Sequence, residues 1–176
     1  MKVLVSILVS LFIIGCSHDS HKGVIPSLSS TMMSKSGSNI SGDLEFTQKK
    51  NGVELVVSLD GLAPNSKHGF HIHAIGDCSS ADGKSAGGHF NPEGHNHGAP
   101  HLSSHHLGDL GNLRANSKGQ GQKTIFIERA VLGGTSKLSI LNRAVIVHKK
   151  MDDMSSQPSG NAGPRIGCAV ISPKTN

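Results

Sequence analysis

The apolar residues of this chain come in short alternating runs, and this pattern narrows most sharply the folds that the chain can adopt. Residues 41–48 (SGDLEFTQ) and 52–59 (GVELVVSL) alternate apolar and polar side chains around a KKNG turn signal, which predicts a β-hairpin. Further strands are predicted at residues 68–73, 123–128, 144–149 and 166–171, with a weaker one around residues 31–35. No stretch carries a helical stripe, and residues 108–121 (GDLGNLRANSKGQG) are broken up by glycines. The sequence therefore predicts an all-β antiparallel sandwich or barrel.

The composition agrees with one domain whose core is aliphatic. The 176 residues include 22 glycines and five phenylalanines but no Trp or Tyr, so Val, Ile and Leu must fill the interior. The formal net charge of +5 is spread along the chain without a block of Lys or Arg. This distribution argues against nucleic-acid binding, whereas a mildly positive surface suits a small anionic substrate.

The first residues are typical of a targeting segment. Lys2 precedes an apolar run from Val3 to Ile14, which is too short to span a bilayer and has the length of a secretory signal core. The run ends in IIGC, which resembles the lipobox of bacterial lipoproteins, where the cysteine is acylated. A plain signal peptide with an incidental cysteine is the alternative.

Three segments are expected from this pattern: a signal peptide at 1–15, a lipid-anchored flexible linker at 16–30 that begins at Cys16, and a folded domain at 31–176. Ser17, as a residue other than Asp after the cysteine, resembles outer-membrane sorting. We therefore expect a protein of the periplasm or cell envelope that contacts the membrane through its N-terminal lipid only.

The three cysteines are consistent with export. If Cys16 carries the lipid, Cys78 and Cys168 remain as an even pair in an oxidising compartment. The alternative is metal ligation, but neither residue has a neighbouring Cys at the usual short spacing. A disulfide between Cys78 and Cys168 is therefore predicted, and closing so long a loop would stabilise the fold by about 4–5 kcal/mol.

Residues 69–78 (GFHIHAIGDC) place two histidines on one face of a predicted strand. His71 and His73 alternate with Phe70 and Ile72, which would face the core. Two imidazoles that point to one spot from a rigid strand suit a transition metal. His68 has the parity of the core residues, so we expect a satisfied core histidine there and not a ligand.

The segment 76–108 lacks periodicity, and a loop this long in a compact domain needs something that orders it. A disulfide at Cys78 could do so, as could a cluster of metal ligands, because residues 87–112 contain six histidines. A low-complexity metal-binding tract is the alternative. Against it, the GGH, NP and GDLG segments resemble fixed turns around specific ligands.

Six motifs together resemble the Cu,Zn superoxide dismutase family. GFHIH, AGGHFNP, HGAP, HLGDLGN, AVIVH and GNAGPRIGCAVI occur in the family's order and at nearly its spacing, from about Ser41 to Pro173. A lone HxH would also suit a cupin, but a cupin would need a Glu after the pair, where this chain has Asp77 and Cys78. The resemblance implies an eight-stranded antiparallel Greek-key barrel or sandwich, Ig-like, with two long functional loops. It also implies an enzyme that converts superoxide into O₂ and H₂O₂.

The resemblance further implies a binuclear site with copper and zinc as cofactors. Copper would be bound by His71, His73, His89 and His148. Zinc would be bound by His89, His97, His106 and Asp109. Imidazoles suit both oxidation states of copper, and three nitrogens with one carboxylate are typical of a closed zinc site.

Spacing separates these ligands from their neighbours. His106 is preferred to His105 because it stands three residues before Asp109, and His97 is preferred to His95 because it directly precedes GAP. His95, His101 and His105 are expected on the loop surface. His89 would contact both metals as an imidazolate and accept a proton when copper is reduced.

Two residues outside the ligand set have roles implied by the same resemblance. Asp152, in HKKMDDM, would join a copper histidine, His71, to a zinc histidine, His97. Arg165, in NAGPRIGC, would hold superoxide beside copper through its fork of donors. The loop at 149–164 departs from the family because it is short and lacks the acidic-lysine string of the animal enzymes.

The functional prediction is protection of the cell envelope by superoxide dismutation. The alternative is a non-catalytic periplasmic module on the same fold that binds copper and zinc for storage or delivery. A homodimer is possible, but the sequence carries no clear interface signature.

Overall fold

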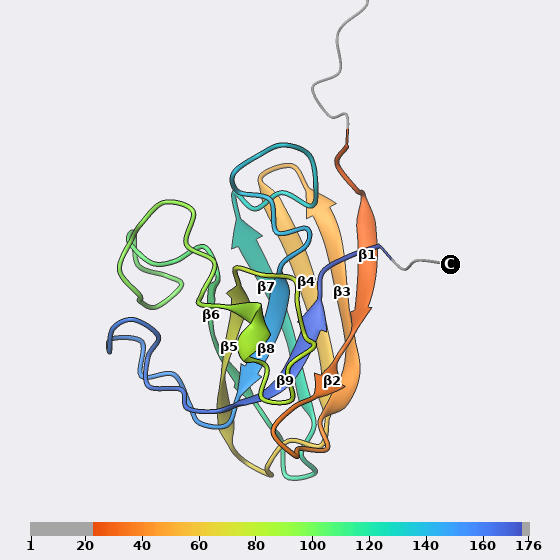
Figure 1. Ribbon diagram of the computed structural model, residues 1–176, viewed down its shortest axis with the longest axis vertical. Helices are drawn as coiled ribbons and strands as arrows, with labels where there is room; N and C mark the ends of the chain where they lie inside the picture. Colours follow the sequence, from red (N-terminus) through yellow and green to blue (C-terminus); the bar gives the residue numbers. More distant parts are fainter. Residues whose placement is uncertain (1–22, 174–176) are drawn as a thin grey trace, which may run out of the picture.

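A computed structural model describes residues 23–173 as two antiparallel β-sheets packed face to face (Figure 1). The first sheet has the order β1 (Ser27–Thr31), β3 (Ser41–Lys49), β4 (Gly52–Asp60) and β7 (Gly121–Glu128). The second has the order β2 (Met33–Ser34), β9 (Arg165–Val170), β8 (Ala144–His148), β5 (Lys67–His73) and β6 (Asp109–Arg114). The all-β sandwich prediction is confirmed.

Helical structure within residues 23–173 is limited to one 3₁₀ turn, Lys84–Ala86. No helix in this part of the chain has the length and apolar character needed to cross a membrane. The predicted signal peptide and the predicted lipidation site, Cys16, lie outside the described residues.

The N-terminal strand joins the two sheets. β1 pairs with β3, and after the single residue Met32 the chain continues as β2, which pairs with β9. Nine strands are therefore described among residues 23–173, so the predicted count of eight is not confirmed; β1 and β2 are two of the nine and pair in different sheets. The linker prediction, 16–30, was wrong at its C-terminal end, because Ser27 to Ser30 already pair with β3.

β6 was not predicted, and its one glycine, Gly111, explains why. Gly111 has a φ of +77°, and the pairing of β5 with β6 shifts register between Gly69 and His71, as at a β-bulge. A glycine that permits this backbone looks in the sequence like a turn.

The core lies between the sheets and is aliphatic, as the composition predicts. Its largest fully buried side chains come from both sheets and the connecting loops: Phe46, Phe70, Ile40, Leu44, Leu55, Leu59, Ile72, Leu113, Leu132, Ile140 and Ile171. Ile146 belongs to a second, smaller buried cluster with Cys78, Ala86, Ala144 and Cys168. His68 is 2% exposed and fully satisfied, because its Nδ1 bonds the His148 carbonyl (2.8 Å) and its Nε2 bonds the Ser66 hydroxyl (2.6 Å). This agrees with its predicted place in the core.

Two long loops extend from the second sheet. Residues 74–108 connect β5 to β6, and residues 149–164 connect β8 to β9. Figure 1 shows the loop at 149–164 and the later part of the loop at 74–108 at the left, beyond β5 and β6, whereas the first part of the loop at 74–108 passes in front of β8 and β9. The sheet supplies a rigid face, and the loops cover it.

Candidate metal centre

β5 presents His71 and His73 on its outer face, as the alternation predicts. Phe70, which precedes His71, and Ile72, which lies between the two histidines, are fully buried in the core. β8 lies next to β5, with His71 opposite Ile146, and His148 ends that strand. The sheet thus brings three of the predicted copper ligands together.

His89 reaches the same place from the loop at 74–108. Its residue forms an isolated β-bridge with His73, and the next residue, Phe90, donates its N–H to the Ile72 carbonyl (2.8 Å). The Arg143 guanidinium lies 4.5 Å from the centroid of the Phe90 ring and donates to the Ala74 carbonyl. The loop is therefore fixed to β5 directly beside His89.

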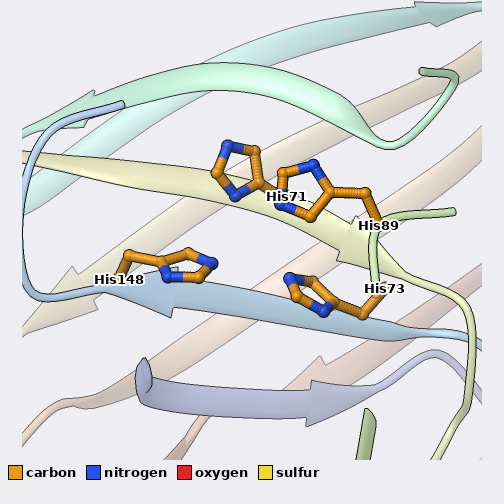
Figure 2. A group of neighbouring side chains, drawn as sticks. All are labelled: His71, His73, His89 and His148. Carbon is orange, nitrogen blue, oxygen red and sulfur yellow. The ribbon is translucent and has the colours of Figure 1, made fainter. Parts of the chain in front are cut away.

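The four predicted copper ligands form a compact cluster. His71, His73, His89 and His148 each offer one nitrogen, and these nitrogens all lie within 4.8 Å of one another. Figure 2 shows the rings of the two strands and of His89 converging on a common space. The ring centroids of His71 and His89 are 4.0 Å apart.

The four predicted zinc ligands form a second cluster that shares His89. The Nδ1 atoms of His89, His97 and His106 lie 2.8, 3.0 and 3.3 Å from Asp109 Oδ1. Oδ2 of Asp109 accepts the N–H groups of His106 (2.9 Å) and Gly98 (3.2 Å), which fixes the carboxylate. His105 and His95 are outside both clusters, as predicted.

Hydrogen bonds at the opposite ring nitrogens determine which nitrogen is free to bind a metal. His73 Nδ1 donates to the Gly87 carbonyl (2.8 Å), and His148 Nδ1 donates to the Gly163 carbonyl (2.9 Å). A carbonyl only accepts, so the proton is on Nδ1 and the lone pair is on Nε2.

Six buried nitrogens in the two clusters have no hydrogen-bond partner among the described residues: His71 Nδ1, His73 Nε2, His89 Nε2, His97 Nδ1, His106 Nδ1 and His148 Nε2. Buried polar atoms are normally paired, because leaving one unpaired costs about 1–3 kcal/mol. These atoms belong to the predicted ligands and face the two clusters. The donor sets, four imidazoles in one and three imidazoles with a carboxylate in the other, fit copper and zinc.

Asp152 links the two clusters. Its Oδ2 accepts a hydrogen bond from His71 Nε2 (2.8 Å), and its Oδ1 accepts one from His97 Nε2 (2.9 Å). Asn112 on β6 holds the main chain of Asp152 through two bonds, 2.8 and 2.9 Å. The carboxylate therefore fixes both rings with their Nδ1 atoms facing the clusters.

The protonation states suit metal binding. Burial lowers the pKa of His89 to about 4 and that of His148 to about 3, and the neighbouring His71 adds to both shifts. Burial acts to raise the pKa of Asp109, but hydrogen bonds from His106 and His89 outweigh it and hold the pKa well below its usual range. At neutral pH His89 and His148 are therefore neutral imidazoles and Asp109 is an ionised carboxylate, the states that metal binding needs. The pKa of His97 is raised instead, because the effect of its burial is outweighed by Asp152 and Asp109.

Arg165 lies beside the copper cluster on β9. It is opposite His148 in the sheet, and its guanidinium donates to the carbonyls of Gly83 (2.7 Å) and Gly87 (2.5 Å). Gly87 also accepts the bond from His73, so one carbonyl links the arginine to this ring.

The predicted disulfide is present. Cys78 and Cys168 are bonded, with their Cα atoms 5.8 Å apart. Because Cys168 is on β9 and Cys78 is in the loop at 74–108, the bond ties this loop to the strand that carries Arg165.

Three residues that support the site were not predicted: Arg143, Asn112 and Gln157, whose side chain bonds the main-chain N–H and carbonyl of His97. Each acts on main-chain atoms or on a residue distant in the sequence, so spacing along the chain carries no signal for it. Asn112 was visible only as part of the GDLGN motif.

The comparisons with known proteins agree with this geometry. The family model described as copper/zinc superoxide dismutase (SODC) matches residues 40–171. The Cu-Zn superoxide dismutase of Paramecium bursaria Chlorella virus 1 is 42% identical over 139 residues, which cover 75% of this chain and 72% of that protein. Superoxide dismutase 2 (Cu-Zn) of Mesembryanthemum crystallinum is 41% identical over 140 residues, covering 76% and 87%.

Solved structures share the fold. A SOD-like protein from Bacillus subtilis superposes with a TM-score of 0.74 at 34% identity, covering 81% of this chain and 97% of that one. The clock protein EA4 superposes with a TM-score of 0.73 at 34% identity, covering 82% and 92%. The chain therefore belongs to the copper/zinc superoxide dismutase family, and copper and zinc are its cofactors.

Proposed function

We propose that this chain dismutates superoxide into O₂ and H₂O₂ at a binuclear site in which His89 is shared by copper and zinc. The observation that carries the proposal is the pair of donor clusters, seven residues in all, with His89 in both. All six histidines direct an unpaired, buried nitrogen into these clusters.

In this proposal copper would be held by His71 Nδ1 and by the Nε2 atoms of His73, His89 and His148, and it would supply the one-electron redox chemistry. Zinc would be held by the Nδ1 atoms of His89, His97 and His106 and by Asp109. The partners of the opposite nitrogens, Gly87, Gly163 and Asp152, keep the rings in place.

His89 is the proposed proton carrier. Dismutation consumes two protons for every two superoxide anions, and the second product leaves as H₂O₂. His89 Nε2 is buried and unpaired among the copper-cluster residues, so this atom would hold the proton, while Nδ1 lies 2.8 Å from Asp109 Oδ1 in the zinc cluster. Solvent supplies the second proton.

Arg165 is the proposed binding residue for superoxide. The carbonyls of Gly83 and Gly87 fix its guanidinium next to the copper cluster. Burial is the largest cause of the lowered pKa of the nearby His73 and His148, and the charge of Arg165 lowers both further. A fixed positive charge there attracts a small anion and stays charged at every physiological pH.

Protection of the cell envelope is the proposed role, with the predicted lipid at Cys16 as the anchor. Fractionation of cells that express the wild type and Cys16→Ala tests this part. The wild type should sediment with membranes, and the variant should not.

Metal analysis with a superoxide assay tests the proposal as a whole. Purified protein loaded with both ions should hold one copper and one zinc per chain and consume superoxide, whereas the metal-free protein should not. His89→Ala should lower zinc retention and activity together. Unchanged metal content and full activity in this variant would contradict the shared-ligand assignment.

A further inference from the structure

Gln157, in the loop at 149–164, binds the main chain of His97 in the other long loop. Its Oε1 accepts the His97 N–H (2.9 Å), and its Nε2 donates to the His97 carbonyl (2.9 Å) and to the Ser155 carbonyl (3.2 Å). The carboxamide thus pairs with both polar groups of one residue, as a neighbouring strand would.

Within residues 23–173, the two bonds from Gln157 are the only hydrogen bonds that the main-chain N–H and carbonyl of His97 make. His97 lies outside the strands, and no backbone hydrogen bond of this part of the chain reaches its N–H or its carbonyl. The residue is only 4% exposed, so unpaired groups there would carry a desolvation cost. One side chain, 60 residues away in sequence, satisfies both.

The same loop also holds the ring of His97. Asp152 Oδ1 accepts its Nε2–H at 2.9 Å, which leaves Nδ1 facing Asp109 at 3.0 Å. With the ring held at one end by Asp152, the position of Nδ1 depends on where the main chain of His97 lies, and Gln157 fixes that main chain.

We propose that Gln157 is a positioning residue for the zinc site: it clamps His97 so that Nδ1 stays where the metal needs it. The inference rests on the proposed role of His97 as a zinc ligand. Removing the carboxamide should loosen zinc and leave copper, because His73 and His148 are held by the carbonyls of Gly87 and Gly163 instead.

Zinc release from the fully loaded protein to a chromogenic chelator tests the proposal. Gln157→Ala and Gln157→Met should both release zinc at least about tenfold faster than the wild type, the lower end of the range for outer partners of metal ligands. Copper retention should stay within about twofold. Met is included because it keeps the length of the side chain without an amide, which separates hydrogen bonding from packing.

Cobalt(II) bound in place of zinc gives a second readout, because its visible spectrum reports the geometry of the ligands. The spectrum should change in both Gln157 variants. Gln122→Ala is the matched control, since Gln122 is an exposed residue of β7 whose side chain makes no hydrogen bond within the described residues. His97→Ala gives the reference for full loss of the ligand.

Circular dichroism of the metal-free variants should show an intact fold, because Gln157 itself is exposed. Wild-type zinc binding with unchanged release and an unchanged cobalt spectrum in both Gln157 variants would overturn this inference alone. A wild-type protein that binds no zinc, or a His97→Ala protein that keeps it, would overturn the proposed function as well.

Discussion

Gly160→Ala should break the link between the two metal clusters, and the size of the effect follows from the structure. Gly160 has a φ of +66°, and a Cβ atom there would lie 1.8 Å from Asp152 Oδ1 and 2.7 Å from His97 Nε2. The substitution therefore adds backbone strain of about 1–2 kcal/mol. It also displaces a charge-assisted hydrogen bond that contributes about 1.5–3 kcal/mol. We expect a total loss of about 2.5–5 kcal/mol in the free energy of unfolding.

Gly37→Ala is the matched control. Gly37 has nearly the same φ, +71°, but a Cβ atom there would meet nothing within 4 Å. Its substitution should cost only the strain, about 1–2 kcal/mol. Urea unfolding of the metal-free proteins at neutral pH measures both values. If Gly160→Ala lowers the free energy of unfolding no more than Gly37→Ala does, the claim that a Cβ atom at position 160 disrupts the hydrogen bond between Asp152 and His97 is refuted.

Three further predictions concern the disulfide, Arg165 and pH. Thiol titration of the denatured, unreduced domain should find Cys78 and Cys168 oxidised, and two free thiols per chain would contradict the disulfide. Replacing both cysteines with Ser should lower the free energy of unfolding by about 4–5 kcal/mol. Arg165→Lys should remain slower than the wild type at high salt, where the Debye length falls from about 10 to about 3 Å, because an ammonium group lacks the paired donors of a guanidinium. If the Lys and Ala variants reach the wild-type rate at high salt, Arg165 acts only through the long-range electrostatic field. The folded pKa of His89 is lowered to about 4 from 6.5, so the unfolded chain binds more protons between these values and stability falls as the pH falls through them. Between pH 6.5 and about pH 5 this residue alone should cost the metal-free protein about 2 kcal/mol, and a urea midpoint that does not move with pH would refute it.

The two clusters of candidate ligands were predicted through the resemblance of six motifs to the family, and the structure brings the seven residues together. The residues alone give less: the parity of His71 and His73 with Phe70 and Ile72 predicts only that these two histidines share a face. The strand at 109–114 could not be predicted, because Gly111 serves a β-bulge that looks like a turn when the partner strand is unknown. The start of the domain was placed too late for a similar reason: β1 is weakly patterned and becomes a strand through its pairing with β3.

The residues that support the ligands were harder to predict for a different reason. Gln157 acts on the main chain of a residue 60 positions away, and any amide of suitable reach could do the same. Arg143 contributes through a ring contact with Phe90, which depends on how the loop folds back on β5. Such contacts are set by tertiary structure and leave no periodic or spaced signal.

Counting how many superoxide anions each copper consumes tests the central claim most directly. A storage or delivery module could use up about one superoxide per copper, because reduction of a bound Cu(II) ion happens once. An enzyme returns to its starting state. We predict that the copper- and zinc-loaded protein removes a large molar excess of superoxide with a second-order rate constant near the diffusional ceiling, on the order of 10⁹ M⁻¹s⁻¹, and yields one H₂O₂ for every two superoxide anions. Consumption that stops after about one superoxide per copper would contradict the account.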